Sequence, residues 1–170
     1  MTAFVALLRA VNVGGTGKLP MADLRRLCEA AGFGKVATFI ASGNVVFESD
    51  ESEAAVKRAL ERQLEAWSGK KLGVAVRTAA EIAAVADDNP FAEAAPNHTV
   101  AIFLDEPPPA DAAEKAVRRT DERIALGKRE IYVTYPGGMG RSKLRIPAAR
   151  EGTARNMNTV RTLARMAADL

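Results

Sequence analysis

The sequence predicts an α+β fold built from two ferredoxin-like halves (βαββαβ-type) packed together, the second half being a partial duplicate of the first. In the first half, hydrophobic periodicity gives the order β-α-β-β-α-β, which is the split βαβ unit. In the second half the order β-α-β-β-α recurs without a clear last strand. A chain of 170 residues is long enough for one ordinary domain or for two small subdomains.

The first half, residues 1–78, is expected to contain two helices and four strands. The first helix begins at Pro20 and stops at Gly32, since proline suits a first helical turn and glycine a C-terminal stop. The second helix opens at the capping-box pair Asp50 and Glu53. Its apolar stripe consists of Val56, Ala59, Leu60, Leu64 and Trp67. Runs of β-branched and aromatic residues mark the strands, at 4–8, 36–40, 45–47 and 72–77.

Residues 79–98 are expected to form a connecting helix and loop, opened by a capping box of Thr78 with Glu81 and ended at Asn89-Pro90. The second half, residues 99–170, then begins. Its expected helices are a short one capped by Asp111 with Glu114 and a basic C-terminal one from about Asn156, whose inward face is Met157, Val160, Leu163, Ala164 and Ala167. Its expected strands are 99–104, 123–126 and 130–135.

Composition narrows the functional classes. Hydrophobic residues make up 48% and charged residues 26%, the profile of a soluble globular protein. A single cysteine (Cys28) and a single histidine (His98) argue against a disulfide framework and against Cys-rich or multi-histidine metal sites. We therefore expect no metal and no cofactor. With no signal-peptide pattern and no run near the ~20 apolar residues of a membrane span, the sequence predicts a cytoplasmic protein that does not bind membranes.

The net charge of +3 conceals a segregation along the chain. Residues 1–35 carry 5 basic and 2 acidic side chains, residues 36–127 carry 10 and 16, and residues 128–170 carry 9 and 3. Basic ends around an acidic middle fit either a basic binding patch or solvated helix faces. Both interpretations stay open at this point.

Glycine-rich turns supply the first candidate anion sites. The loop after the first strand contains Asn12, Gly14, Gly15 and Lys18, preceded by Arg9, and its backbone N–H groups could face a phosphate at a helix N-terminus. It fails the P-loop pattern twice, because Asn12 stands where the first glycine should be and Leu19 where a hydroxyl residue should be. An ordinary βα turn explains the same glycines.

Three further polar clusters join the candidate ligand-binding set. A second glycine-rich turn, 136–140, leads into Arg141, Ser142 and Lys143, which could hold phosphate or carboxylate or belong to a plain surface loop. At the start of the last helix lie Arg155, Asn156 and Asn158, more polar groups than one N-cap requires. Ser42 and Asn44 flank a glycine that suits a hairpin turn, which needs no function.

Five segments, taken in order, resemble the bacterial family called domain of unknown function 1697. They are 7–15 (LLRAVNVGG), 38–47 (TFIASGNVVF), 89–91 (NPF), 140–144 (GRSKL) and 153–160 (TARNMNTV). The resemblance covers residues 3 to about 167, and it departs from the family at Met157, where relatives usually have a tryptophan. It implies a cytoplasmic α+β protein with two ferredoxin-like halves, and no activity, cofactor or catalytic residue. It also implies that the polar residues of these segments share one site.

Three hypotheses on function follow. The favoured one is a protein that binds a phosphate-bearing ligand, a nucleotide or a nucleic-acid backbone, in a basic cleft formed by the glycine-rich turns. The second is an enzyme acting on a small anionic substrate, with Ser42 or Ser142 as nucleophile and Lys143 or Arg155 stabilising charge. The third is an assembly module that pairs exposed sheet edges and takes no small ligand. The sequence assigns no catalytic residue and no oligomeric state.

Overall fold

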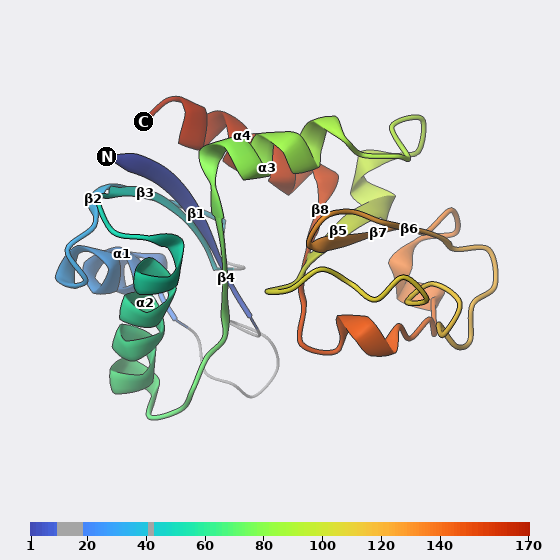
Figure 1. Ribbon diagram of the computed structural model, residues 1–170, viewed down its shortest axis with the longest axis horizontal. Coiled ribbons are helices and arrows are strands. Elements are labelled where there is room, and N and C mark those ends of the chain that lie inside the picture. The colour runs from blue at the N-terminus through green and yellow to red at the C-terminus, as the bar shows by residue number, and fades with distance from the viewer. Residues whose placement is uncertain (10–18, 41–42) are drawn as a thin grey trace. The chain divides into compact units, whose positions relative to one another are not determined.

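The computed structural model spans residues 1–170 and describes all of them except 10–18 and 41–42. The chain forms two compact units (Figure 1). The first unit contains Met1–Ala83 and Leu163–Leu170, and the second contains Ala84–Thr162. The boundaries fall inside helices α3 (Ala79–Asp87) and α4 (Met157–Ala168), so the chain enters and leaves the second unit through a helix.

The first unit holds a four-stranded antiparallel sheet with strand order β2-β3-β1-β4. Its strands are β1 (Thr2–Leu8), β2 (Gly34–Phe39), β3 (Asn44–Ser49) and β4 (Val74–Thr78). Two helices, α1 (Met21–Ala30) and α2 (Glu53–Ser68), lie on one face of this sheet (Figure 1). Their arrangement follows from the right-handed crossovers that β-α-β connections adopt.

Alternating apolar residues of the first sheet meet the apolar stripes of α1 and α2 in one core. Phe47 on β3 lies at its centre, with its ring stacked on Phe33 at a centroid distance of 4.2 Å and next to Phe4 at 5.9 Å. Cys28 on α1 is fully buried in the same core. Gly32 ends α1 with φ +90°, a left-handed conformation that glycine adopts without strain.

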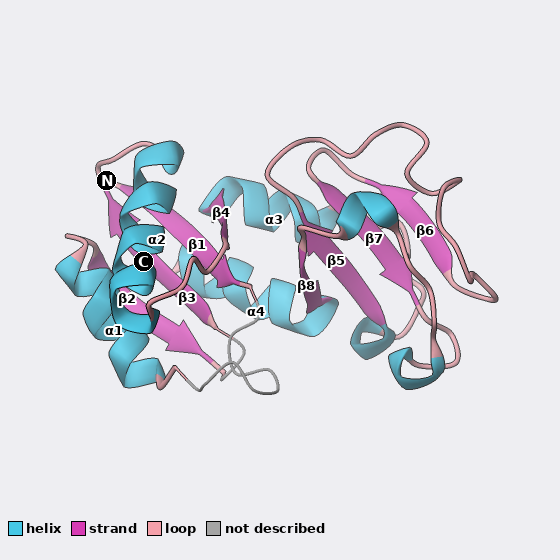
Figure 2. Ribbon diagram, turned by 90° about the horizontal axis from the view of Figure 1, so that it is seen from below, coloured by secondary structure: helices cyan, strands magenta, loops and turns pink. Residues whose placement is uncertain are grey.

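The second unit holds another four-stranded antiparallel sheet, in the order β6-β7-β5-β8. Its strands are β5 (Thr99–Phe103), β6 (Arg123–Leu126), β7 (Glu130–Thr134) and β8 (Thr153–Asn156). The segments that connect these strands are mostly loops (Figure 2), with short 3₁₀ turns at Met139–Arg141 and Pro147–Ala149. A further 3₁₀ turn, Pro96–His98, precedes β5. One apolar cluster of this unit joins Val100, Ile102, Ile131 and Val133 of the sheet to Ile146 of the loop before β8.

The structure confirms an α+β protein, in the form of two four-stranded antiparallel sheets with four helices among the described residues. The capping box of α3 is as expected, with Thr78 Oγ1 accepting from Glu81 N at 3.2 Å and Glu81 Oε1 accepting from Thr78 N at 2.9 Å. The hairpin of β6 and β7 across Gly127 also forms. No helix of the described chain is long and apolar enough to cross a membrane.

Four expectations need correction. The second sheet does have a fourth strand, β8, and α4 begins after it at Met157. The segment around Asp111 forms a single turn and not the expected short helix. Lys115 N donates to Asp111 O, and the chain then continues as a loop. The N-cap of α2 is Ser52, whose side chain accepts from Ala55 N, and not Asp50. Trp67, in the last turn of α2, is 40% exposed and is not part of the buried stripe.

Candidate functional site

A cationic groove of about 480 Å³ lies in the second unit. It is lined by four basic side chains and one hydroxyl, those of Arg118, Arg119, Arg141, Lys143 and Thr120. No carboxylate lines it. All five side chains are exposed, so the groove is open to solvent and to ligands.

Two loop segments form the walls of this groove. The segment 117–122 precedes β6, and the segment 139–145 follows β7. They are joined at one end by an antiparallel bridge, in which Val117 N donates to Arg145 O at 2.8 Å and Arg145 N donates to Val117 O at 3.0 Å. The bridge fixes the register of the two walls, so that cations from both face the same space.

A buried carboxylate, Glu122, joins the walls a second time. Its side chain is 3% exposed and accepts hydrogen bonds from three groups: Ser142 Oγ, Thr120 N at 2.6 Å and Thr120 Oγ1 at 3.2 Å. Ser142 Oγ in turn accepts from Leu144 N at 3.2 Å. These hydrogen bonds, the one from Ser142 foremost, lower the pKa of Glu122 to about 2. Glu122 is therefore ionised at neutral pH and holds Ser142 between the exposed Arg141 and Lys143.

Arg118 and Arg119 are set by local backbone geometry. Arg118 has φ +57°, a left-handed conformation that costs an L-residue about 1 kcal/mol or more and is over-represented at functional sites. Arg119 Nε donates to Glu122 O at 2.8 Å, which closes a tight turn over the buried carboxylate. Among the described residues, Arg118, Arg141 and Lys143 form no ion pair, so their charge is available to an external anion.

The candidate residues of the first unit have structural roles where the structure describes them. Asn44 is fully buried at the start of β3 and its Nδ2 donates to Phe39 O at 3.0 Å, closing the β2–β3 connection. Arg9 is half-buried, its N–H donates to Gly73 O at 2.9 Å, and its side chain lies along Gly73. Asn12, Gly14, Gly15, Lys18 and Ser42 lie outside the described residues.

The third cluster is separate from the groove. Arg155 lies on β8, at the opposite edge of the sheet from β6, and burial lowers the pKa of its guanidinium to about 10, so it stays charged at neutral pH. Asn156 is the N-cap of α4, its Oδ1 accepting from Thr159 N at 2.9 Å. Asn158 has an exposed side chain on the first turn of α4. None of the three lines the groove.

Sequence reasoning found two of the four groove cations and missed Arg118, Arg119 and their support, Glu122. The missed residues belong to the acidic middle of the chain, so segment-wise charge pointed away from them. The adjacent Arg118 and Arg119, in a stretch with no helical or strand periodicity, were the signal that could have found them.

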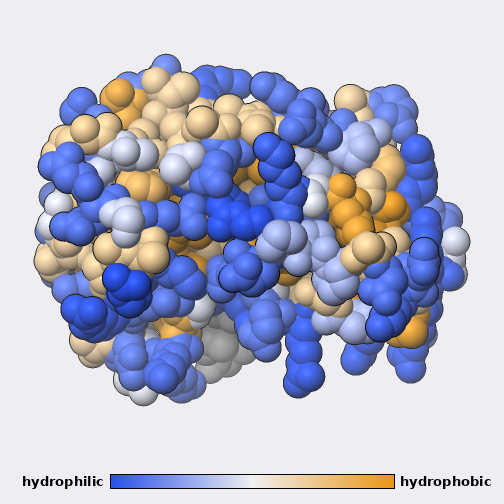
Figure 3. Space-filling model, viewed as in Figure 1, coloured by the Kyte–Doolittle hydropathy of each residue, from blue (hydrophilic) through white to orange (hydrophobic). Residues whose placement is uncertain are grey.

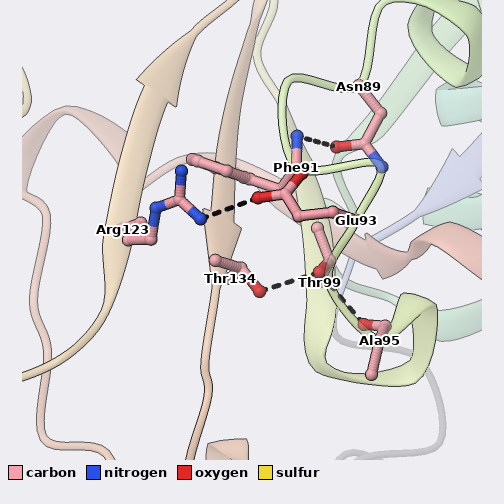
Figure 4. A network of polar contacts seen from close by, with 7 residues as sticks. All are labelled: Asn89, Phe91, Glu93, Ala95, Thr99, Arg123 and Thr134. Carbon is pink, nitrogen blue, oxygen red and sulfur yellow. Dashed lines mark hydrogen bonds and ion pairs between the residues drawn. The ribbon is translucent and has the colours of Figure 1, made fainter.

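The segment Asn89-Pro90-Phe91 is structural (Figure 4). Asn89 Oδ1 accepts from Phe91 N at 3.0 Å, and the buried Phe91 ring lies under the Arg123 guanidinium, 4.8 Å from its carbon. Arg123 also pairs with Glu93 at 2.8 Å. Next to this network Thr99 and Thr134 share a hydrogen bond of 2.9 Å across β5 and β7. The network holds the loop before β5 on the sheet.

Two observations among the described residues bear on metal binding and on nucleophilic chemistry. No group of three His, Cys, Asp or Glu side chains there could hold a metal ion. Burial raises the pKa of the Cys28 thiol to about 12, so this residue is not a ready nucleophile. Met157 is fully buried, so its side chain is part of the interior.

The fold and groove define an α+β protein of two antiparallel sheets with a cationic surface site. The chain belongs to the family described as Protein of unknown function (DUF1697), whose profile matches residues 1–132. A solved structure described as that of the conserved bacterial protein SP0830 from Streptococcus pneumoniae is similar, with a TM-score of 0.82 and 25% identity over 99% of both chains. No curated protein has significant similarity to this chain.

Proposed function

We propose that this protein binds a phosphate-bearing ligand, a nucleotide or a nucleic-acid backbone, in the cationic groove of the second unit. One observation carries the proposal. Four basic side chains, from two loops joined by backbone hydrogen bonds, line one open groove, and no carboxylate of the described residues lines it. Because like charges repel, four positive side chains in one groove are unfavourable for the free protein, and a bound anion relieves this repulsion. The same arrangement lowers the free energy of a bound phosphate.

The groove residues have distinct roles in this proposal. The guanidinium groups of Arg118, Arg119 and Arg141 present planar forks that match two oxygens of one phosphate, and Lys143 adds a point charge. Ser142 and Glu122 act through position, because their hydrogen bond holds Arg141 and Lys143 on one wall.

The alternative of an enzyme with Ser142 as nucleophile is disfavoured by the same geometry. A serine needs a neighbouring base to remove its proton, and the carboxylate within reach is Glu122. A pKa of about 2 makes that carboxylate too weak a base near neutral pH, where efficient general bases titrate near 7. Ser142 Oγ is also engaged as acceptor by Leu144 N, so its role is structural.

Two further points accompany this proposal. Both sheets have the order second-third-first-fourth strand, which supports two copies of one ferredoxin-like unit. A cytoplasmic location, where nucleotides and nucleic acids are abundant, suits this function.

The test is fluorescence anisotropy of a fluorescein-labelled single-stranded 12-mer and of a labelled adenosine triphosphate, each titrated with protein at 20 mM and 300 mM NaCl. We expect binding at 20 mM that weakens at 300 mM, because phosphate contacts release counterions. Absence of binding of both probes at 20 mM would overturn the proposal. Binding of one probe alone identifies which form of phosphate ligand the groove accepts.

A matched pair of variants assigns the site. Arg141→Ala with Lys143→Ala removes two charges from the groove, and Arg58→Ala with Arg62→Ala removes two from exposed positions on α2 that are interspersed with Glu61 and Glu65. We expect the groove variant to lose about tenfold or more in affinity at low salt, from charged hydrogen bonds of about 1.5–3 kcal/mol each before screening. The α2 variant should lose less than twofold. Equal losses would show that binding follows net charge and not the groove.

A further inference from the structure

A second, chemically different cavity of about 630 Å³ lies in the second unit, and none of its lining residues lines the groove. Its inner wall is the face of the sheet, at Ile102 on β5 and at Tyr135 just after β7. Its outer wall is the loop 144–150, which contains the 3₁₀ turn Pro147–Ala149. The volume falls in the range of about 300–1,000 Å³ typical of small-molecule sites.

The cavity exists because this sheet face is thinly covered. In the first unit two helices cover the corresponding face, whereas in residues 84–162, all of which the structure describes, loops and short turns take their place. The loop is held close at one end by Gly152, where an added Cβ would stand 2.5 Å from Ile102 Cγ2. At the other end the Val117–Arg145 bridge anchors it. The space between these two anchors is therefore a fixed feature of the fold.

Six of the nine residues that line this cavity have aliphatic side chains. Leu144, Ile146 and Pro147 face the cavity from the loop, and Ile102 faces it from the sheet. Val117, at the edge, is 50% exposed, and two backbone hydrogen bonds fix its position. Such walls accept the ring or branched body of an apolar group by removing its surface from water.

The polar groups of the cavity are basic or hydrogen-bond donors. Arg145 and Arg150 contribute two guanidinium groups, and no carboxylate lines the cavity. The Tyr135 hydroxyl makes no hydrogen bond with any described residue, and burial together with the Glu122 carboxylate raises its pKa, so it keeps its proton and can donate. The charge of these groups therefore favours an anionic head over a neutral one.

We propose that this cavity is a second binding site, for a small amphipathic anion with an aromatic or branched apolar body and a carboxylate, sulfonate or phosphate head. The apolar body lies between Ile102, Tyr135 and Leu144, and the head meets Arg145 and Arg150. A small ligand is favoured over a protein partner because the space is a pocket under a loop rather than a flat patch. On the face shown in Figure 3, apolar residues form only small groups among hydrophilic ones.

The test uses two probes that share an apolar aromatic body. 8-Anilinonaphthalene-1-sulfonate carries an anionic head, and N-phenyl-1-naphthylamine is neutral. We expect saturable one-to-one fluorescence enhancement with the anionic probe, and weaker binding of the neutral one. Urea titrations at the same protein concentration show whether the binding belongs to the folded chain. No saturable binding of the anionic probe to the folded chain would overturn the proposal.

Variants locate the site and separate it from the groove. Arg145→Gln keeps the backbone bridge and should weaken the anionic probe about tenfold, the loss of one charged hydrogen bond, while leaving the neutral probe within twofold. Arg161→Gln, an exposed arginine on α4, is the matched control and should change neither. Val117→Trp should block the mouth and abolish both signals. The groove variant Arg141→Ala with Lys143→Ala should leave both probes unchanged.

Two outcomes contradict this assignment. Equal weakening of both probes in Arg145→Gln would show that the arginine acts on packing and not on the charged head. A concentration-dependent dimer in sedimentation that excludes the anionic probe would show that a second copy of the chain covers the cavity. Neither outcome bears on phosphate binding in the groove, so this inference and the proposed function fail separately.

Discussion

Gly152→Ala tests how closely the loop 144–152 is held against the second sheet. An alanine Cβ there would stand 2.5 Å from Ile102 Cγ2, 3.0 Å from Leu104 Cδ2 and 3.2 Å from Ala149 O. Apolar carbons prefer about 3.5–4.0 Å, so the loop or Ile102 must move by about 1 Å. Ile102 is β-branched and has few alternative rotamers, and Ala149 O belongs to the backbone. A small side-chain movement therefore cannot remove the clash.

Overpacking of this size costs about 1–3 kcal/mol of unfolding free energy. With a urea m-value of about 2 kcal/mol/M, the midpoint should fall by about 0.5–1.5 M. Gly140→Ala is the control, because nothing lies within 4 Å of its added Cβ. Its midpoint should stay the same or rise slightly through the lower entropy of the unfolded chain. If the two variants unfold at the same urea concentration, the loop is not held as described.

Three further predictions concern caps and ionisable groups. Asn156→Ala should lose about 0.5–2 kcal/mol of unfolding free energy, because it removes the N-cap of α4, whereas Asn158→Ala should lose less than about 0.5; thermal melts decide this. The pKa of Glu122 is about 2 in the folded chain against its usual 4.5, so its contribution to stability is complete above pH 4.5 and is lost as the pH falls toward 2. The urea midpoint of Glu122→Gln should therefore vary less than that of the wild type between pH 4.5 and pH 2. Cys28, buried with its pKa raised to about 12, should react with a thiol reagent at pH 8 only after denaturant is added, and rapid labelling of the native chain would contradict its burial.

Periodicity was a good guide to the first unit because its elements are long and pack on one core. Val56, Leu60 and Leu64 recur at helical spacing and are all fully buried. The capping box of Thr78 and Glu81 was likewise readable, since both of its hydrogen bonds are local in sequence. Local signals of this kind need no knowledge of the tertiary structure.

The second unit was harder because its structure depends on contacts between distant segments. β8 is four residues long and polar at Arg155 and Asn156, so its sequence looks like a helix cap, and only pairing with β5 makes it a strand. The groove needs Glu122 and Ser142, twenty residues apart, to meet. Sequence spacing contains no information on such a meeting.

The site prediction divides in the same way. Arg141 and Lys143 were found because a glycine-rich turn precedes them, and they do line a basic groove. Arg118 and Arg119 were missed because charge was summed over a long acidic stretch, whereas electrostatic attraction between exposed charges acts over about 8 Å at physiological salt. The charges that matter for a ligand are those of side chains that lie close together in the folded chain.

The most direct test of the central claim is the salt dependence of binding of the labelled 12-mer to the wild type and to the variant Arg141→Ala with Lys143→Ala. Each phosphate neutralised on a single strand contributes about −0.7 to the slope of log K against log salt. With two of four groove cations removed, the slope should become less steep by about 1.4. An unchanged slope would show that these two side chains contact no phosphate and would contradict the account of the groove.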